Sequence, residues 1–187
     1  EEIGTNVLFS IANSDNKSAM WFAPAGFNRG ALTGFVVNTN SRLKTSDRDD
    51  LYEAKINPIA NFPNEDYVVW GQKTLQRSAS SLDRVNVRRM LLEVKRVILG
   101  IARRLLFKRN NAALRQQFIS QLSPRLSFIQ ANQGIEKFKI IMDDTNNTPD
   151  EIDRNRLIGQ IFIQPTRTAE FIVLDFVVQP TGATFPE

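Results

Sequence analysis

The stretch that decides the fold is residues 85–107, which read VNVRRMLLEVKRVILGIARRLLF. Its apolar residues recur at alternating spacings of four and three, the repeat of one face of an α-helix. This apolar stripe consists of Val87, Leu91, Val94, Ile98, Ile101 and Leu105. The spacing predicts a long amphipathic helix over about residues 85–107, with its stripe against the core of the domain.

Two further rows with a seven-residue repeat run along the same predicted helix. The row opposite the stripe is basic and consists of Arg89, Arg96 and Arg103. The row beside it is apolar and consists of Leu92, Leu99 and Leu106. A helix with two apolar rows contacts more than one neighbour. Deep burial in its own domain and contact with another subunit both fit this pattern.

A second helix is predicted after Asn110 and Asn111, which can cap its N-terminus. Its apolar residues follow a four-residue spacing: Leu114, Phe118 and Leu122. Proline has no N–H group to donate and disfavours a helix interior. We therefore expect a break or kink at Pro124, with Ser123 capping a further helical stretch to about Ala131.

Strand patterns occupy the C-terminal third of the chain. We predict strands over residues 137–142, 157–164 and 171–178, with a shorter strand over residues 67–70. Residues 171–178 are apolar on both faces apart from Asp175, so both faces should be covered. The fold class is therefore α/β or α+β, a mixed sheet flanked by two or three helices.

The remaining segments give weaker signals. Residues 20–27 are aromatic and end in Pro and Gly, which favours a strand end that enters a turn. Residues 46–53 are charged and favour a surface helix or loop. Residues 143–153 form a polar excursion between two strands.

Composition excludes several classes of function. The chain has 187 residues, enough for one or two domains with a real core, and it contains no Cys and no His. Disulfides, thiolate nucleophiles and cysteine metal sites are therefore excluded, and the commonest general base is absent. No segment approaches the roughly 20 apolar residues that a membrane helix needs, so no membrane partner is expected. The first residues, Glu1 to Gly4, resemble an internal start.

Motifs for chemistry are equally scarce. The sequence has no dinucleotide-binding glycine motif, P-loop, nucleophile elbow or zinc spacing. Acidic residues gather between residues 143 and 153, but without the glycine and glutamate positions of an EF-hand. We therefore predict no catalytic residue, no metal site and no cofactor, and no enzyme activity.

The charge is mildly positive and unevenly distributed. The net charge is +4, and between residues 88 and 115 nine basic residues accompany a single acid, Glu93. Such a segment faces an acidic partner or water. Phosphate binding would also use clustered Lys and Arg, but no nucleic-acid reading module is recognisable. A basic nucleic-acid-binding module stays open as an alternative of a different class.

An ordered set of segments resembles the tail sheath proteins of contractile-tailed phages, especially those of the large T-even type. The segments, which recur in family order, are WFAPAGFNRG (21–30), INPI (56–59), VVWGQKT (68–74), DRVNVRR (83–89), NN (110–111), DTNNTP (144–149), IDRN (152–155) and QPTR (164–167). Family members are considerably longer, with an N-terminal arm and surface-facing domains that these residues lack. Pro124 inside the second helix is a further departure.

The resemblance implies a structural subunit, the C-terminal portion of a sheath protein. It would polymerise as a helical stack of rings around the tail tube protein and drive ejection by contraction. Baseplate and tail terminator proteins would be further partners, and nucleic acid would not. The location would be the tail sheath of the virion, assembled in the host cytoplasm. A tailocin or another phage-derived contractile injection system would use a similar sheath.

The resemblance also implies domains and contact residues. Residues 1–20 would be a remnant of a preceding segment, residues 21–178 the sheath core domain, and residues 179–187 a C-terminal arm. Tube exteriors in the family tend to be acidic, and the candidates to meet them are Arg103, Arg104, Lys108, Arg109 and Arg115. Terminal arms of neighbours would complete the sheet. The candidates for that contact are Phe171, Val173, Asp175, Val177, Pro180 and Phe185.

Overall fold

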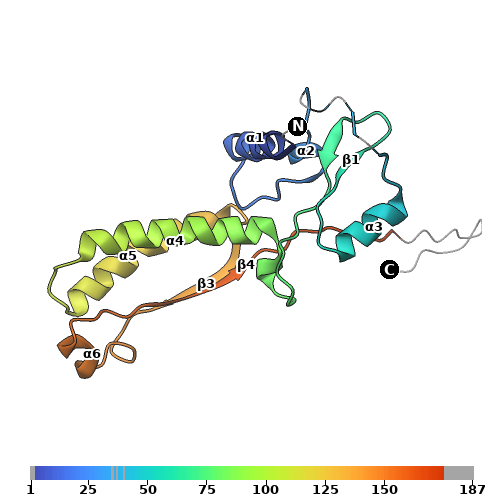
Figure 1. Ribbon diagram of the computed structural model, residues 1–187. Helices are drawn as coiled ribbons and strands as arrows, with labels where there is room; N and C mark the ends of the chain where they lie inside the picture. The colour runs from blue at the N-terminus through green and yellow to red at the C-terminus, as the bar shows by residue number, and fades with distance from the viewer. Residues whose placement is uncertain (1–2, 35, 37, 40, 175–187) are drawn as a thin grey trace, which may run out of the picture.

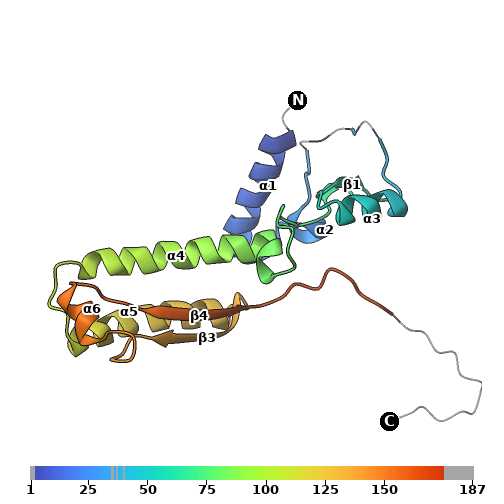
Figure 2. The ribbon, with the colours of Figure 1, turned by 60° about the horizontal axis from the view of Figure 1, so that its bottom comes forward.

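The computed structural model describes residues 3–34, 36, 38–39 and 41–174. The helices are α1 (Ile3–Lys17), α2 (Gly26–Arg29), α3 (Thr45–Glu53), α4 (Val85–Leu105), α5 (Ala112–Ala131) and α6 (Pro149–Asp153), with a 3₁₀ turn, η1 (Ser81–Asp83). The strands are β1 (Ile59–Asn61), β2 (Tyr67–Val69), β3 (Ile135–Ile141) and β4 (Gln160–Pro165). Helices α4 and α5 form an antiparallel hairpin that lies along the β3–β4 pair, and α1–α3 with β1 and β2 lie at the far end of α4 (Figures 1 and 2).

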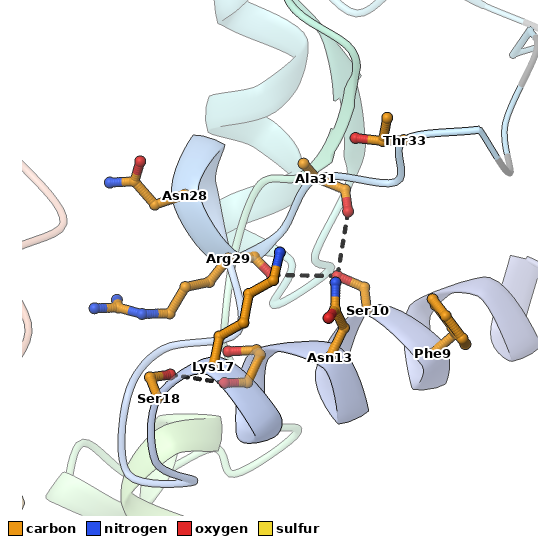
Figure 3. Close-up of a pocket in the computed structure, with 10 residues that line it drawn as sticks. Phe9, Ser10, Asn13, Lys17, Ser18, Asn28, Arg29, Ala31 and Thr33 are labelled. Carbon is orange, nitrogen blue, oxygen red and sulfur yellow. Dashed lines mark hydrogen bonds between the residues drawn. The ribbon is translucent and has the colours of Figure 1, made fainter.

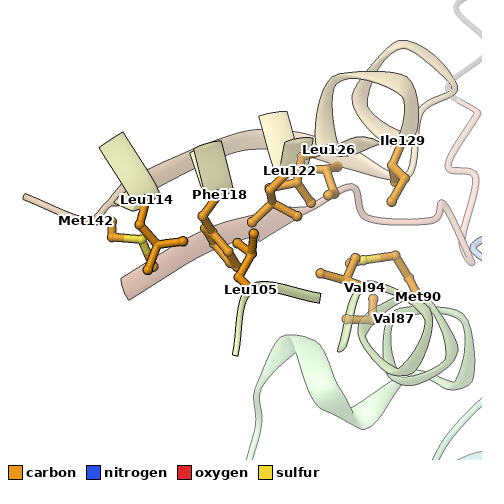
Figure 4. Close-up of a cluster of buried hydrophobic side chains, with 11 residues drawn as sticks. Val87, Met90, Val94, Leu105, Leu114, Phe118, Leu122, Leu126, Ile129 and Met142 are labelled. Carbon is orange, nitrogen blue, oxygen red and sulfur yellow. The ribbon is translucent and has the colours of Figure 1, made fainter. Parts of the chain in front are cut away.

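The main core lies between the α4–α5 hairpin and the β3–β4 sheet (Figure 4). Its buried side chains come from α4 (Val87, Met90, Val94, Leu105), from α5 (Leu114, Phe118, Leu122, Leu126, Ile129) and from the sheet side (Ile135, Met142). The predicted stripe of α4 is confirmed, because each of its residues is buried or packs against this cluster. Removing these side chains from water is the main source of stability for this part of the chain.

Helix α5 corrects the prediction at Pro124. The side chain of Asn111 accepts a hydrogen bond from the backbone N–H of Leu114 at 3.0 Å, so the expected cap is confirmed. The helix then continues to Ala131 with Pro124 inside it, so of the break or kink expected there, the break is wrong. Leu122 and Leu126, on either side of the proline, both stay buried in the core. Burial of this continuous apolar face outweighs the one hydrogen bond that proline cannot make.

Strands β3 and β4 pair in antiparallel order, with Phe138 opposite Ile163 and Ile140 opposite Ile161. These four side chains pack against the core, whereas Lys139 and Phe162 alternate onto the other face and are exposed. The sheet therefore has one covered face and one open face. Within the described ranges the sheet contains only these two strands.

The third predicted strand is not formed in the described residues. Phe171 to Leu174 belong to no strand, and the rest of residues 171–178 lies outside the described residues. The physical reason is that no neighbouring strand edge within the described chain lies beside this segment to supply hydrogen bonds.

A smaller sheet forms at the N-terminal end. Strand β2 confirms the strand predicted for residues 67–70, and it pairs in antiparallel order with β1. The bridge from Ala31 to Val68 joins the chain before α3 to this sheet. The mixed α and β class is confirmed, but the described residues build two separate antiparallel pairs rather than one mixed sheet.

Of the two weaker predictions, for residues 46–53 and 20–27, the first is confirmed and the second is wrong. Residues 46–53 are helical, as one of the two alternatives predicted, and they form most of α3. Residues 20–27 contain no strand and instead turn into α2. The backbone there bonds locally, with Phe22 N–H donating to Ala19 and Gly30 N–H to Gly26, which leaves no extended segment.

Candidate assembly surfaces

Among the described residues, no group of three or more acidic side chains is arranged to hold a metal ion. No helix in the described ranges combines the length and apolarity needed to cross a membrane.

A hollow of about 470 Å³ lies between α1 and the chain around α2 (Figure 3). One of its hydroxyl groups joins these segments, because Ser10 donates to the carbonyl oxygen of Arg29 at 3.2 Å. The hydroxyl of Ser18 instead bonds locally, to the carbonyl oxygen of Ser14 at 2.7 Å at the end of α1. Ser10 thus ties α1 to the end of α2.

The turn that joins α4 to α5 presents a bare aromatic residue. Phe107 is fully exposed, at 105%, and its φ is 64°, in the left-handed region that bulky residues rarely adopt. Leu106 beside it is 61% exposed. The helical pattern had placed Phe107 at the end of the predicted amphipathic helix and gave no sign of this exposure. The signal that could have found it was its position directly before the polar run Lys108 to Asn111.

Four of the five cations predicted to contact a tube surround this turn. Arg103, Arg104, Lys108 and Arg109 are all exposed and lie at the end of α4 or just beyond it. The ammonium group of Lys108 donates to the side-chain oxygen of Gln117 at 3.1 Å. The turn is therefore both apolar and basic.

Arg115 does not belong to this exposed group. It is buried, and its guanidinium forms an ion pair with Asp144 at 2.5 Å. A guanidinium engaged inside the fold cannot present a free charge to a partner. We therefore withdraw Arg115 from the tube-contact candidates.

The outer face of α4 exposes the second apolar row. Leu92, Leu99 and Leu106 are 64%, 54% and 61% exposed, so the described part of the chain does not bury them. The basic row is divided: Arg89 forms an ion pair with Asp15 of α1, whereas Arg96 pairs with Glu93 on the surface at 2.6 Å. Of the two alternatives left open for the leucine row, deep burial in its own domain does not hold here.

The segment after β4 exposes four consecutive apolar side chains. Phe171, Ile172, Val173 and Leu174 are 69%, 81%, 92% and 70% exposed, and the segment runs away from the hairpin (Figure 2). A contiguous apolar stretch of this kind marks an interaction site or an aggregation hazard. The other strand or arm candidates, Asp175, Val177, Pro180 and Phe185, lie outside the described residues.

Residues 77–179, more than half of the chain, match the family described as "Phage tail sheath C-terminal domain". The chain belongs to the phage tail sheath family. The expected family resemblance is thereby confirmed.

Curated relatives of this sheath chain carry the name "Tail sheath protein". One from Enterobacteria phage T4 is 38% identical over 185 residues, which cover 99% of this chain and 28% of the relative. One from Vibrio phage KVP40 is 38% identical over 94% of this chain and 26% of the relative. One from Salmonella phage ViI is 30% identical over 94% of this chain and 28% of the relative. The sheath chain spans about a quarter of the length of these relatives.

Solved structures share the fold of the sheath chain. A chain from the sheath complex of an extracellular contractile injection system, PVC, in its contracted state has a TM-score of 0.84 and 24% identity, covering 91% of this chain and 49% of its own. A chain from the baseplate of the anti-feeding prophage has a TM-score of 0.83 and 23% identity, covering 92% of this chain and 49% of its own. These comparisons favour the sheath interpretation and give no support to a nucleic-acid-binding module.

Proposed function

We propose that this chain is the C-terminal part of a structural subunit that polymerises around a tail tube and drives its ejection by contraction. One observation carries the proposal: a chain of the tail sheath family extends four exposed apolar residues, Phe171 to Leu174, beyond the β3–β4 sheet, whose two edges are unpaired among the described residues. The segment and the sheet edges are complementary, because the edge strands have backbone groups free to hydrogen-bond and the segment has apolar side chains exposed to water.

The arm contact is proposed to be strand addition between subunits. In this contact the backbone of residues 171–178 of one subunit pairs with the open edge of the sheet of a neighbour. Alternate side chains of the added strand then set its register. Residues 21–178 are proposed as the core domain and residues 179–187 as the C-terminal arm. Pairing of this kind would link rings while their subunits rotate.

The tube contact is proposed to use the turn between α4 and α5. The exposed cations Arg103, Arg104, Lys108 and Arg109 suit an acidic tube exterior, and Phe107 adds an apolar anchor at their centre. Single exposed ion pairs contribute only about 0–1 kcal/mol each. A contact built from many weak pairs can release when the sheath widens, while the lattice as a whole stays connected.

A phage tail and a phage-derived injection system use related sheaths, and the sequence comparisons favour the phage. The phage relatives reach 38% identity, whereas the injection-system chains share the fold at 24% identity or less. The proposed partners are copies of the same protein, a tail tube protein, and the baseplate and terminator proteins that end the stack. The proposed location is the tail of the virion.

Electron microscopy of the protein that carries this chain tests the proposal. We expect helical tubes or rings at raised protein concentration, and sheathed tubes when the tail tube protein is added. Val173→Asp places a charge in the exposed apolar segment, and it should abolish the polymers while leaving the circular dichroism spectrum unchanged. Leu75→Asp, at a position that is 85% exposed but outside the segment, is the matched control. A protein that stays monomeric under all assembly conditions would refute the proposal.

A further inference from the structure

Glu170, the residue directly before the exposed residues 171–174, is bound by side chains from the body of the chain. Its carboxylate accepts a hydrogen bond from the Arg84 Nε atom at 2.7 Å and from the Tyr52 hydroxyl at 3.0 Å. The Gln72 side-chain amide also donates to it, at 3.2 Å. Arg84 precedes α4, Tyr52 lies on α3, and Gln72 follows β2. Three segments that are distant in sequence therefore meet at one carboxylate.

The side chains of Arg84, Tyr52 and Glu170 form a closed ring of hydrogen bonds, in which each residue bonds to the other two. The second nitrogen of the Arg84 guanidinium donates to the Tyr52 hydroxyl at 3.0 Å, and that hydroxyl donates onward to Glu170. Burial and the Glu170 carboxylate raise the pKa of Tyr52, which keeps its hydroxyl protonated as a donor. The side chains of Glu170 and Arg84 are only 19% and 25% exposed, so water screens their ion pair less than a surface pair.

Two further contacts hold the residues on either side of Glu170. The Asn86 side-chain amide donates to the Thr168 hydroxyl at 3.1 Å and also to the carbonyl oxygen of Trp21 at 3.2 Å. The ring of Phe171 meets the ring of Tyr52 edge to face, with centroids 5.4 Å apart. Beyond Phe171 the side chains are almost bare, at 81% exposed for Ile172 and 92% for Val173. The anchored part thus ends abruptly where the exposed part begins.

We infer that Glu170 is a positioning residue that fixes the point and direction in which the C-terminal segment leaves the body. This inference rests on the proposed strand addition, and it specifies how the adding strand is prepared. An anchored segment has already lost much of its freedom before a neighbour binds, so less ordering is required at assembly. Anchoring at Glu170 also keeps residues 171–174 from folding back onto the exposed face of their own β3–β4 sheet.

A distance measurement between two spin labels tests this inference in the isolated chain. The chain has no cysteine, so Ile172→Cys and Gln121→Cys give one label on the segment and one on the exposed side of α5. We expect a single narrow distance distribution in this labelled parent. Adding Glu170→Ala should broaden the distribution at least twofold, and Glu170→Gln should have a smaller effect because it keeps one acceptor oxygen.

Matched variants separate anchoring from general damage. Glu151→Ala removes another ion-paired glutamate, which contacts Arg156 at 3.3 Å, and it should leave the distribution narrow. Tyr52→Phe removes only the hydroxyl that bonds to Glu170 and Arg84, and it should broaden the distance distribution while the chain stays folded. It therefore tests the inference even if Glu170→Ala unfolds the chain. A broad distribution in the parent, or an unchanged one in both Glu170→Ala and Tyr52→Phe, would overturn the inference. Absence of polymers together with a narrow parent distribution would count against the proposed function alone.

Discussion

The guanidinium of Arg115, on α5, lies 2.5 Å from the carboxylate of Asp144 in the turn after β3. The two side chains have contrasting surroundings: that of Arg115 is 8% exposed and that of Asp144 is 88% exposed. The ion pair therefore joins an exposed turn, through Asp144, to the buried guanidinium of Arg115. It links the helical hairpin to the sheet and belongs to the fold rather than to a partner surface.

Arg115→Glu should destabilise the chain itself. The change buries a carboxylate beside Asp144, so the free energy of unfolding should fall by about 3 kcal/mol. Urea unfolding followed by circular dichroism measures this fall. Asp144→Asn should cost much less, because the amide oxygen still accepts a bond and the position is open to water. An Arg115→Glu protein as stable as the parent would contradict the internal role.

Arg104→Glu should weaken binding to the tube without loss of stability, if the proposed tube contact is correct. Reversing one exposed charge in a basic cluster removes an attraction and adds a repulsion. Co-sedimentation with preformed tubes, repeated at low and high salt, measures the effect, which should be larger at low salt. Arg125→Glu reverses an exposed charge on α5, away from the turn, and is the matched control. Equal loss of binding in both variants would argue against a contact at the turn.

Deleting residues 180–187 should leave a folded monomer that forms no extended sheaths. The core between the α4–α5 hairpin and the β3–β4 sheet is built by residues 87–142, so we expect the thermal midpoint to stay within a few degrees of that of the parent. Negative-stain images of the protein under assembly conditions supply the second measurement. Sheaths of normal length from the deleted protein would show that the end of the chain is dispensable for the lattice.

Gly134→Ala should destabilise the junction between α5 and β3. A β-carbon there would lie 2.6 Å from Ile129 and 2.8 Å from the ring of Trp21, and both neighbours are packed in place. Overpacking of this kind costs about 1–3 kcal/mol, measurable by urea unfolding. Gly159→Ala is the control, because its β-carbon would meet only the flexible end of Met142, at 2.5 Å. The free energy of unfolding should fall further in Gly134→Ala than in Gly159→Ala. A larger fall in Gly159→Ala would contradict the prediction.

The pKa of Asp143 is held below its ordinary value of 3.8, first by the hydroxyl of Thr145 and then by the backbone N–H of that residue. The ionised form is favoured by folding, so its stabilisation is present above the ordinary pKa. This stabilisation is lost as the pH falls through the lower pKa of the folded state. Thr145→Val removes the hydroxyl donor and should raise the pKa of Asp143. A carboxyl titration followed by NMR measures the shift, and an unchanged pKa would assign the effect to the backbone alone.

Local patterns in the sequence predicted the main elements of the fold. The alternating spacing of Val87 to Leu105 established α4 and its buried face, and Asn111 established the start of α5. Helical periodicity and capping depend on residues within one or two turns, so a single sequence contains that information. The absence of His and Cys likewise excluded whole classes of chemistry on composition alone.

Contacts between distant residues decided what the patterns left open. Helix α5 runs through Pro124 because Leu122 and Leu126 share one buried face. Arg115 is buried and paired with Asp144, although the family resemblance had grouped it with the exposed cations.

The sequence by itself therefore determined helices α4 and α5, the positions of strands β2, β3 and β4, and the family of this protein. Only the tertiary structure decided which side chains are left without cover, from Leu92 and Phe107 to Ile172, and that Glu170 anchors the segment leading to the last of them. The physical reason is that periodicity reports the conformation of the backbone, whereas exposure depends on which distant segments pack together.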